Sequence, residues 1–225
     1  MEGSLPLRAV QLTKTFSGSS DAITVLQGIE YSFSRQKTYA ITGASGSGKS
    51  TLIHILGGLD QPTTGSVMLG NVSLATLNAK ERASRIGLVF QYPYLIKEIS
   101  VLENIMVAGL IAGDSWSDAQ AKALELLKRV GLAAMDSWEV GRLSGGQKQR
   151  VALARALITK PEFLLADELT GSLDHETGLS VMELVLSCVK EWQMGLIIST
   201  HNPEIARMMQ LVFSLKDGIL VATEQ

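Results

Sequence analysis

The chain has 225 residues, of which 46% are hydrophobic, and its formal net charge is -2. This length suits one domain, or a core domain with an insert, and the apolar content is enough for a sizeable core. The nearly balanced charge provides no basic field, so we expect no nucleic-acid partner. Cys188 is the single cysteine, which excludes an internal disulfide and fits a reducing compartment.

Neither a secretory leader nor a membrane span is expected. Residues 1–10 lack a basic start followed by a long apolar stretch. No apolar run approaches the ~20 residues that a spanning helix requires. We therefore expect a soluble, cytoplasmic chain whose membrane role, if it has one, comes through a partner.

Short apolar runs alternate with helical patterns along the chain. Nearly continuous apolar runs are typical of parallel strands that are covered on both faces. The predicted strands are residues 7–12, 37–42, 86–90, 163–166, 196–200 and 211–215. Residues 17–20 are expected to form a polar loop, and residues 216–218 a turn between the last two strands.

The pattern changes between residues 91 and 150. Helical spacing extends over residues 101–112 and 117–130, with no strand candidate between them. The sequence therefore predicts an α/β core, formed by residues 1–90 and 151–225, with a helical subdomain inserted at residues 91–150.

A glycine-rich loop lies between the strand predicted at residues 37–42 and a helix predicted at residues 50–56. Its glycines allow backbone N–H groups to surround a phosphate, and the helix that follows adds the positive end of its dipole. The phosphate-binding residues expected here are Gly43, Ser45, Gly46, Ser47, Gly48, Lys49, Ser50 and Thr51.

Three of these side chains have specific expected roles. Lys49 would reach the β- and γ-phosphates, Ser50 would bind Mg²⁺, and Thr51 would support the α-phosphate region. The alternative is a Gly/Ser-rich turn that precedes a helix by chance. The strand and the helix that flank the loop favour the phosphate site.

Two carboxylates follow the strand predicted at residues 163–166. At the carboxyl end of a central strand, Asp167 can hold Mg²⁺ through water. Glu168, which would point the other way along the pleat, can polarise an attacking water. The alternative is a pair of solvated acids at a strand end, and the phosphate loop makes this alternative the weaker one.

A second glycine motif consists of Ser144, Gly145, Gly146 and Gln147 at the start of a predicted helix. Ser144 and Gln147 have the spacing of a capping box, so the motif could serve only to cap the helix. However, each glycine weakens a helix by ~1 kcal/mol relative to alanine. We therefore predict a second phosphate cradle, which serves the nucleotide of a second copy of the chain.

In order and spacing, these motifs resemble the ATP-binding cassette ATPases over nearly the whole chain. The resemblance implies a P-loop NTPase fold with a mainly parallel sheet, an antiparallel β subdomain and a helical insert. It also implies ATP hydrolysis and contacts of Gln91 with Mg²⁺ and the attacking water. Asp174 would lie in a loop that crosses the dimer interface, and His201 would contact the γ-phosphate.

Two of the residues to which the resemblance assigns a role leave alternatives open. Phe16 stands where the family has an aromatic that stacks on adenine, but it could equally be a core or loop phenylalanine. His201 could be a polar residue in the turn before a helix that Asn202 caps. The remaining histidines, His54 and His175, are read as ordinary residues.

Segments near residues 74–78, 101–105 and 165–174 resemble the lipoprotein-releasing and macrolide-exporter branch of the family. This resemblance implies an integral membrane permease as partner, bound near residues 92–104, on the cytoplasmic face of the inner membrane. Leu169 departs from the family's proline; we expect it to loosen the backbone beside Glu168 while hydrolysis persists. The alternatives are a soluble ATPase of the same type and a nucleotide switch with low turnover.

Overall fold

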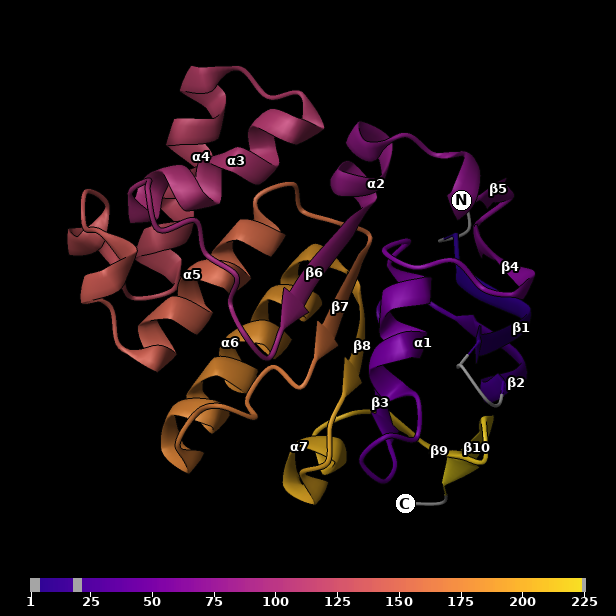
Figure 1. Ribbon diagram of the computed structural model, residues 1–225. Helices are drawn as coiled ribbons and strands as arrows, with labels where there is room; N and C mark the ends of the chain where they lie inside the picture. The colour runs from indigo at the N-terminus through magenta and orange to yellow at the C-terminus, as the bar shows by residue number, and fades with distance from the viewer. Residues whose placement is uncertain (1–4, 18–21, 224–225) are drawn as a thin grey trace.

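The computed structural model describes residues 5–17 and 22–223. Their central element is a six-stranded sheet with the order β10-β9-β3-β8-β7-β6, in which only β10 runs antiparallel to its neighbour (Figure 1). Its strands are β3 (Thr38–Thr42), β6 (Ile86–Phe90), β7 (Phe163–Asp167), β8 (Gly195–Ser199), β9 (Leu211–Lys216) and β10 (Ile219–Thr223). In the register of this sheet Asp167 lies beside Phe90 and Ser199. The carboxyl ends of three strands therefore meet at one edge.

A second, antiparallel sheet has the strand order β2-β1-β4-β5. Its strands are β1 (Leu7–Ser17), β2 (Ala22–Phe33), β4 (Thr64–Leu69) and β5 (Val72–Ser73). Helix α1 (Lys49–Leu56) lies between the two sheets (Figure 1). The buried side chains of α1 pack in the same apolar cluster as those of β1, β2 and β4.

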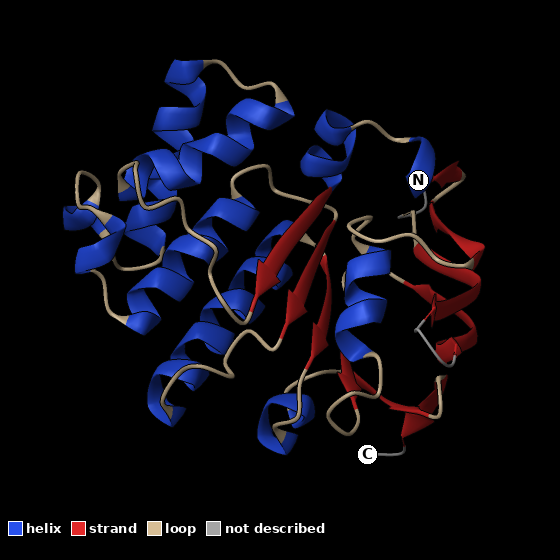
Figure 2. Ribbon diagram, viewed as in Figure 1, coloured by secondary structure: helices blue, strands red, loops and turns tan. Residues whose placement is uncertain are grey.

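The other face of the six-stranded sheet is covered by helices (Figure 2). The remaining helices are α2 (Ala79–Arg85), α3 (Val101–Ala112), α4 (Trp116–Arg129), α5 (Gly145–Leu157), α6 (His175–Trp192) and α7 (Pro203–Arg207), with short 3₁₀ turns at Leu74–Thr76, Ala133–Met135 and Val140–Arg142. Helix α5 packs beside β6, whereas α3 and α4 pack on α5. Successive side chains of β7 alternate between the two apolar clusters, since Leu164 packs with the helices and Leu165 packs with α1. None of the described helices has the length and apolar content of a membrane span.

The expected fold class is confirmed, and each predicted strand is present with ends that shift by a few residues. The helix predicted at residues 101–112 coincides with α3. Ser17 ends β1 rather than starting a loop, and residues 18–20 lie outside the described residues. The expected subdomain boundary at residue 150 falls within α5.

Candidate functional site

The loop between β3 and α1 requires glycine at several positions. Gly43, Gly46 and Gly48 have φ angles of 148°, 77° and 101°, a region that other residues rarely adopt. A Cβ atom on Gly48 would lie 2.6 Å from Val25 Cγ1, and one on Gly43 would lie 2.6 Å from the Leu215 carbonyl oxygen. Both the backbone conformation and the available space therefore select glycine.

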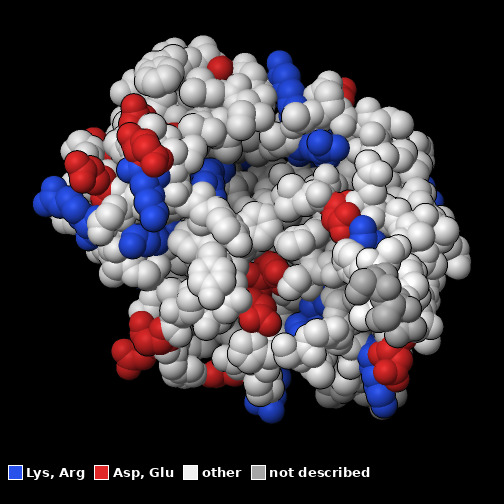
Figure 3. All heavy atoms as spheres, viewed as in Figure 1, with Lys and Arg blue, Asp and Glu red and all other residues white. Residues whose placement is uncertain are grey.

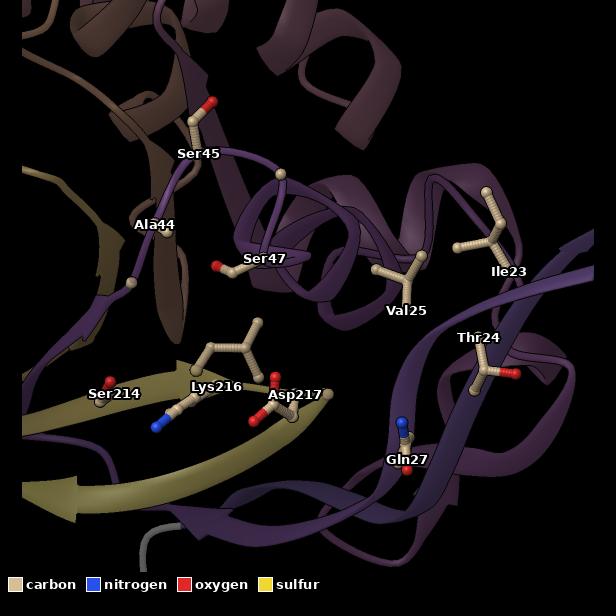
Figure 4. Close-up of a pocket in the computed structure, with 14 residues that line it drawn as sticks. Ile23, Thr24, Val25, Gln27, Ala44, Ser45, Ser47, Ser214, Lys216 and Asp217 are labelled. Carbon is tan, nitrogen blue, oxygen red and sulfur yellow. The ribbon is translucent and has the colours of Figure 1, made fainter.

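The loop curls around the Lys49 ammonium group. Lys49 Nζ donates hydrogen bonds to the carbonyl oxygens of Gly43 at 3.0 Å and Ala44 at 2.9 Å, and the residue is only 6% exposed. Beside the loop opens a cavity of about 690 Å³, lined also by β2 and the β9–β10 turn (Figure 4). This volume lies within the range of small-molecule sites, about 300–1,000 Å³.

Asp167 is contacted through both of its carboxylate oxygens. Ser50 Oγ donates to Asp167 Oδ1 at 3.0 Å, and Ser199 Oγ donates to the same oxygen. His54 Nε2 lies 4.0 Å from Asp167 Oδ2. Sequence reasoning missed Ser199 and read His54 as ordinary. The signal for His54 was available, because residues four apart on a helix share a face and His54 follows Ser50 by four positions.

Glu168 leaves the strand through a tight turn. Strand β7 ends at Asp167, and Glu168 has a left-handed φ of 48°. Its backbone N–H donates to the carbonyl oxygen and to the Oγ of Ser199, both at 3.1 Å. The expectation that the strand pleat orients Glu168 is therefore wrong, because a turn sets its direction. His201 Nδ1 lies 3.3 Å from Glu168 Oε1.

Gln91 and Glu168 flank the same glycine. A Cβ atom on Gly171 would lie 3.1 Å from Gln91 Nε2 and 3.4 Å from Glu168 Oε2. Ser172 Oγ also donates to the Gln91 carbonyl oxygen at 3.2 Å. Acidic atoms gather near the centre of the face drawn in Figure 3, over the ends of β6 and β7. The structure thus joins Gln91, Asp167, Glu168 and His201 into one polar cluster at the sheet edge, with Ser50 beside it.

Leu169 is fully buried in the apolar cluster formed by the helices. Burial of a leucine side chain contributes about 1.5–3 kcal/mol relative to its exposure. This packing opposes the loosening expected from the absence of proline. The effect of Leu169 on turnover stays a prediction.

The second glycine motif is a capped helix start. Ser144 Oγ accepts from the Gln147 N–H at 3.3 Å, and Gln147 Oε1 accepts from the Ser144 N–H at 2.8 Å, which confirms the capping box. A Cβ atom on Gly145 would have no neighbour within 4 Å, whereas one on Gly146 would lie 2.7 Å from Thr177 Cγ2. The Gly145 position is therefore open to a ligand.

A cavity of about 480 Å³ adjoins this helix start. Its lining includes Ser144, Gly145, Gly146, Gln147 and, from the loop before α6, Ser172, Leu173 and Asp174. Asp174 accepts from the backbone N–H of Thr177 at 3.0 Å, and this hydrogen bond lowers the pKa of Asp174. None of the residues that line this cavity lines the cavity of the β3–α1 loop.

Neither Phe16 nor Thr51 lines the first cavity. Phe16 is 45% exposed and pairs across the β1–β2 ladder with Ile23, which lines that cavity. Lys14 Nζ lies 5.0 Å from the centroid of the Phe16 ring. Thr51 is half-buried on the first turn of α1. The structure thus leaves the Phe16 side chain partly exposed beside Ile23, with the Lys14 ammonium over its ring.

Comparison with known proteins agrees with this geometry. A family model described as ABC transporter matches residues 26–171. The lipoprotein-releasing system ATP-binding protein LolD of Legionella pneumophila (strain Lens) is 41% identical over 222 residues, which cover 97% of this chain and 98% of the relative. LolD of Geobacter metallireducens is 44% identical over 220 residues, which cover 96% of this chain and 98% of the relative.

Solved structures give the same answer. The dimeric structure of MJ0796, a bacterial ABC transporter cassette, has a TM-score of 0.88 at 35% identity, covering 95% of this chain and 96% of that one. A dimeric post-hydrolysis state of MJ0796, bound to ADP and Pi, has a TM-score of 0.87 at 34% identity with the same coverage of 95% and 96%. The chain therefore belongs to the ABC transporter family, as a nucleotide-binding subunit that hydrolyses ATP.

Proposed function

We propose that two copies of this chain close on two MgATP molecules and drive an integral membrane permease that releases lipoproteins from the membrane. The observation that carries the proposal is the pair of phosphate cradles, which open into cavities without a shared residue. A head-to-tail dimer joins one cradle of each copy, and the dimeric MJ0796 structures support this arrangement. The names of the LolD relatives support lipoproteins as cargo.

The loop between β3 and α1 holds the phosphates of one nucleotide. Backbone N–H groups from Gly43 to Gly48 surround them, as the positive φ angles of the glycines allow. Lys49 exchanges its two carbonyl acceptors for the β- and γ-phosphates. Thr51 supports the α-phosphate region, and Phe16 stacks on adenine beside Ile23.

Ser50 and Asp167 fit a magnesium ion. Their side-chain oxygens lie 3.0 Å apart, and Mg²⁺ takes oxygen ligands from one or two carboxylates together with substrate phosphates and water. Among the described residues, no group of three or more acidic, histidine or cysteine side chains could hold a metal alone. We assign Ser50, Asp167 and Gln91 to Mg²⁺, which when bound neutralises charge on the β- and γ-phosphates.

The polar cluster at the sheet edge performs the hydrolysis. Glu168 accepts the proton of the attacking water, and a general base of this kind contributes about 10²–10⁴-fold in rate. Gln91 orients that water beside Glu168. His201, 3.3 Å from Glu168, contacts the γ-phosphate.

The second copy completes each site. Its residues Ser144, Gly145, Gly146 and Gln147 approach the γ-phosphate with the positive end of α5, and its Asp174 loop lines the same interface. Residues 91–150 act as a subdomain that turns against the core of residues 1–90 and 151–225. ATP favours the closed pair because it binds that state more tightly.

The permease docks on the exposed surface after β6. Tyr92, Tyr94 and Ile96 are 63%, 68% and 42% exposed, which leaves apolar area for a partner. Leu95 packs partly against the helical cluster, so a charge there would also disturb the fold. Docking at this surface places the chain on the cytoplasmic face of the inner membrane, as a peripheral subunit.

The proposal is tested by purifying the chain from membranes with the subunit that accompanies it. We expect ATP to release a labelled lipoprotein from vesicles that contain this complex, and Glu168→Gln to stop the release. Tyr92→Glu should weaken the membrane association and leave nucleotide binding intact. ATP hydrolysis without any lipoprotein release would refute the cargo, and a chain that never accompanies a membrane protein would refute the coupling.

A further inference from the structure

The segment that follows β6 has a backbone that needs support. Residues 91–95, here called the linking segment, carry the exposed Tyr92 and Tyr94. Tyr94 has a φ of 44°, in the left-handed region that a bulky residue rarely adopts. Such a conformation persists only where neighbouring groups hold it, so the contacts of this segment indicate what controls its position.

Helix α5, which begins at the Ser144–Gln147 turn, holds the linking segment from one side. Arg155 Nη1 donates to the Tyr94 carbonyl oxygen at 2.9 Å, and Arg155 Nη2 donates to the Pro93 carbonyl oxygen at 2.7 Å. Gln149, fully buried on the same helix, donates to the Phe90 carbonyl oxygen at 2.8 Å. The backbone on both sides of Gln91 is thus bonded to α5.

The geometry of the Arg155 contact fixes orientation as well as distance. The planar guanidinium offers two parallel N–H groups, and here they meet two successive carbonyl groups. Hydrogen bonds from a charged donor are stronger than neutral ones. Burial lowers the pKa of Arg155, although the group stays charged, so these bonds are partly shielded from water.

A row of rings holds the linking segment from the other side. The Tyr94 ring lies edge-on to Phe90, with centroids 5.7 Å apart, and Phe90 lies edge-on to His54, also at 5.7 Å. His54 Nε2 in turn lies 4.0 Å from Asp167 Oδ2. The linking segment therefore lies between Asp167 of the polar cluster and helix α5, which begins at the second cradle.

We propose that Arg155 is a positioning residue that ties the linking segment to α5, so that closure of the Ser144–Gln147 turn on nucleotide moves the exposed tyrosines. By thermodynamic linkage, a partner that binds the tyrosines then alters the affinity of the closed pair for ATP. This inference rests on the proposed function, because it takes the turn to close on nucleotide and the tyrosines to face the membrane subunit.

The test places a fluorescent reporter on the linking segment of the full chain. Tyr92→Cys is labelled with bimane in a Glu168→Gln background, and native Cys188 is buried and does not compete. MgATP is added while bimane emission and dimerisation by light scattering are followed. We expect a change in emission on dimerisation, and Arg155→Gln should remove most of this change.

ATP-driven dimerisation distinguishes a positioning role of Arg155 from a general loss of folding or nucleotide binding. In Arg155→Gln the ATP midpoint for dimerisation should shift by no more than about threefold, as for a substitution remote from the ligand. Arg129→Gln is the matched control. Arg129 also binds through two nitrogens, to Glu191 on α6, and it should keep the full change in emission.

Each other outcome has a defined meaning. A full emission change in Arg155→Gln would overturn the inference alone, and loss of ATP-driven dimerisation in this variant would also overturn it. If the parent chain forms no dimer with ATP, the proposed function fails and takes the inference with it. If Arg155→Gln does not fold, Arg155→Lys replaces it in the test. Lysine offers one donor nitrogen in place of two, so the change in bimane emission should be reduced. A full change in emission would contradict the inference.

Discussion

The two proposed phosphate cradles are built by different physical means. In the β3–α1 loop the backbone makes the shape, since three glycines adopt positive φ angles and Gly48 has no room for a Cβ atom. At the start of α5 the backbone is helical and the shape comes from a capping box, with open space at Gly145. Glycine therefore serves the fold at the first cradle, whereas at the second Gly146 makes room for Thr177 and only Gly145 stands in open space.

The cradles also differ in their chemical neighbours. Beside the first lie Lys49, Asp167 and Glu168, which can hold phosphate, bind a cation and accept a proton. The cavity of the second contains Asp174 and neutral polar groups, together with Arg150. We propose that the first cradle performs the reaction and the second closes over it. The predictions below test this division, beginning with the largest expected effect.

The first prediction concerns the chemistry beside the β3–α1 loop. Glu168→Gln should lower ATP turnover by about 10²–10⁴-fold, because the proton acceptor is lost. ATP binding should persist and the dimer should accumulate, which phosphate release and size-exclusion chromatography would show. A variant that retains turnover would move the reaction away from this carboxylate.

The second prediction concerns backbone strain in the first cradle. A side chain at Gly48 would have to adopt a φ of 101° against Val25. We expect Gly48→Ala to lower the free energy of unfolding by about 1–3 kcal/mol, the typical cost of a strained residue. Urea denaturation measures this loss. An unchanged unfolding midpoint would mean that the loop relaxes freely.

The third prediction applies the same substitution to the second cradle. Gly145→Ala meets no neighbouring atom, so the free energy of unfolding should stay constant or rise by up to about 1 kcal/mol. ATP-driven dimerisation should weaken, because a methyl group stands where phosphate approaches. A variant that is stable and also dimerises normally would contradict the claim that Gly145 leaves space for phosphate.

The fourth prediction is the smallest and concerns the loop that lines the second cavity. The hydrogen bond from the Thr177 N–H lowers the pKa of Asp174. The charged carboxylate therefore stabilises the folded chain at a pH above ~4, the ordinary pKa of an aspartate. This stabilisation is lost as the pH falls through the lowered pKa. Asp174→Asn keeps a good cap without a titrating group. Below pH ~4 the native chain should therefore lose stability relative to Asp174→Asn. Thermal unfolding between neutral and acid pH measures the difference, and parallel curves would contradict the assignment.

Local patterns were sufficient for much of this molecule. The apolar runs of β7 and β8, the capped helix at Ser144 and the glycine loop are each recognisable from a few consecutive residues. The half-exposed strand β2 was not delimited, because its outward side chains follow no continuous apolar run. Its identity as a strand comes from pairing with β1 rather than from its own composition.

Local sequence patterns were likewise insufficient for part of the site. Motif spacing predicted Gln91, Asp167, Glu168 and His201 as site residues, but it did not indicate Ser199, which reaches Asp167 only because β7 and β8 are adjacent. The direction of Glu168 also depends on the turn that ends β7, which no pattern of alternation describes. Arg155 contacts a segment that lies about sixty positions earlier in the chain. Tertiary contacts of this kind have no local signal.

The most direct test of the shared site is complementation between two disabled chains, Lys49→Ala and Ser144→Arg. Each alone should form no ATP-dependent dimer and should hydrolyse no ATP, because both of its sites lack one half. In an equimolar mixture only mixed dimers can close, and each has one intact site out of two, so we predict up to about half of the native turnover. A mixture as inactive as its two components would contradict the account.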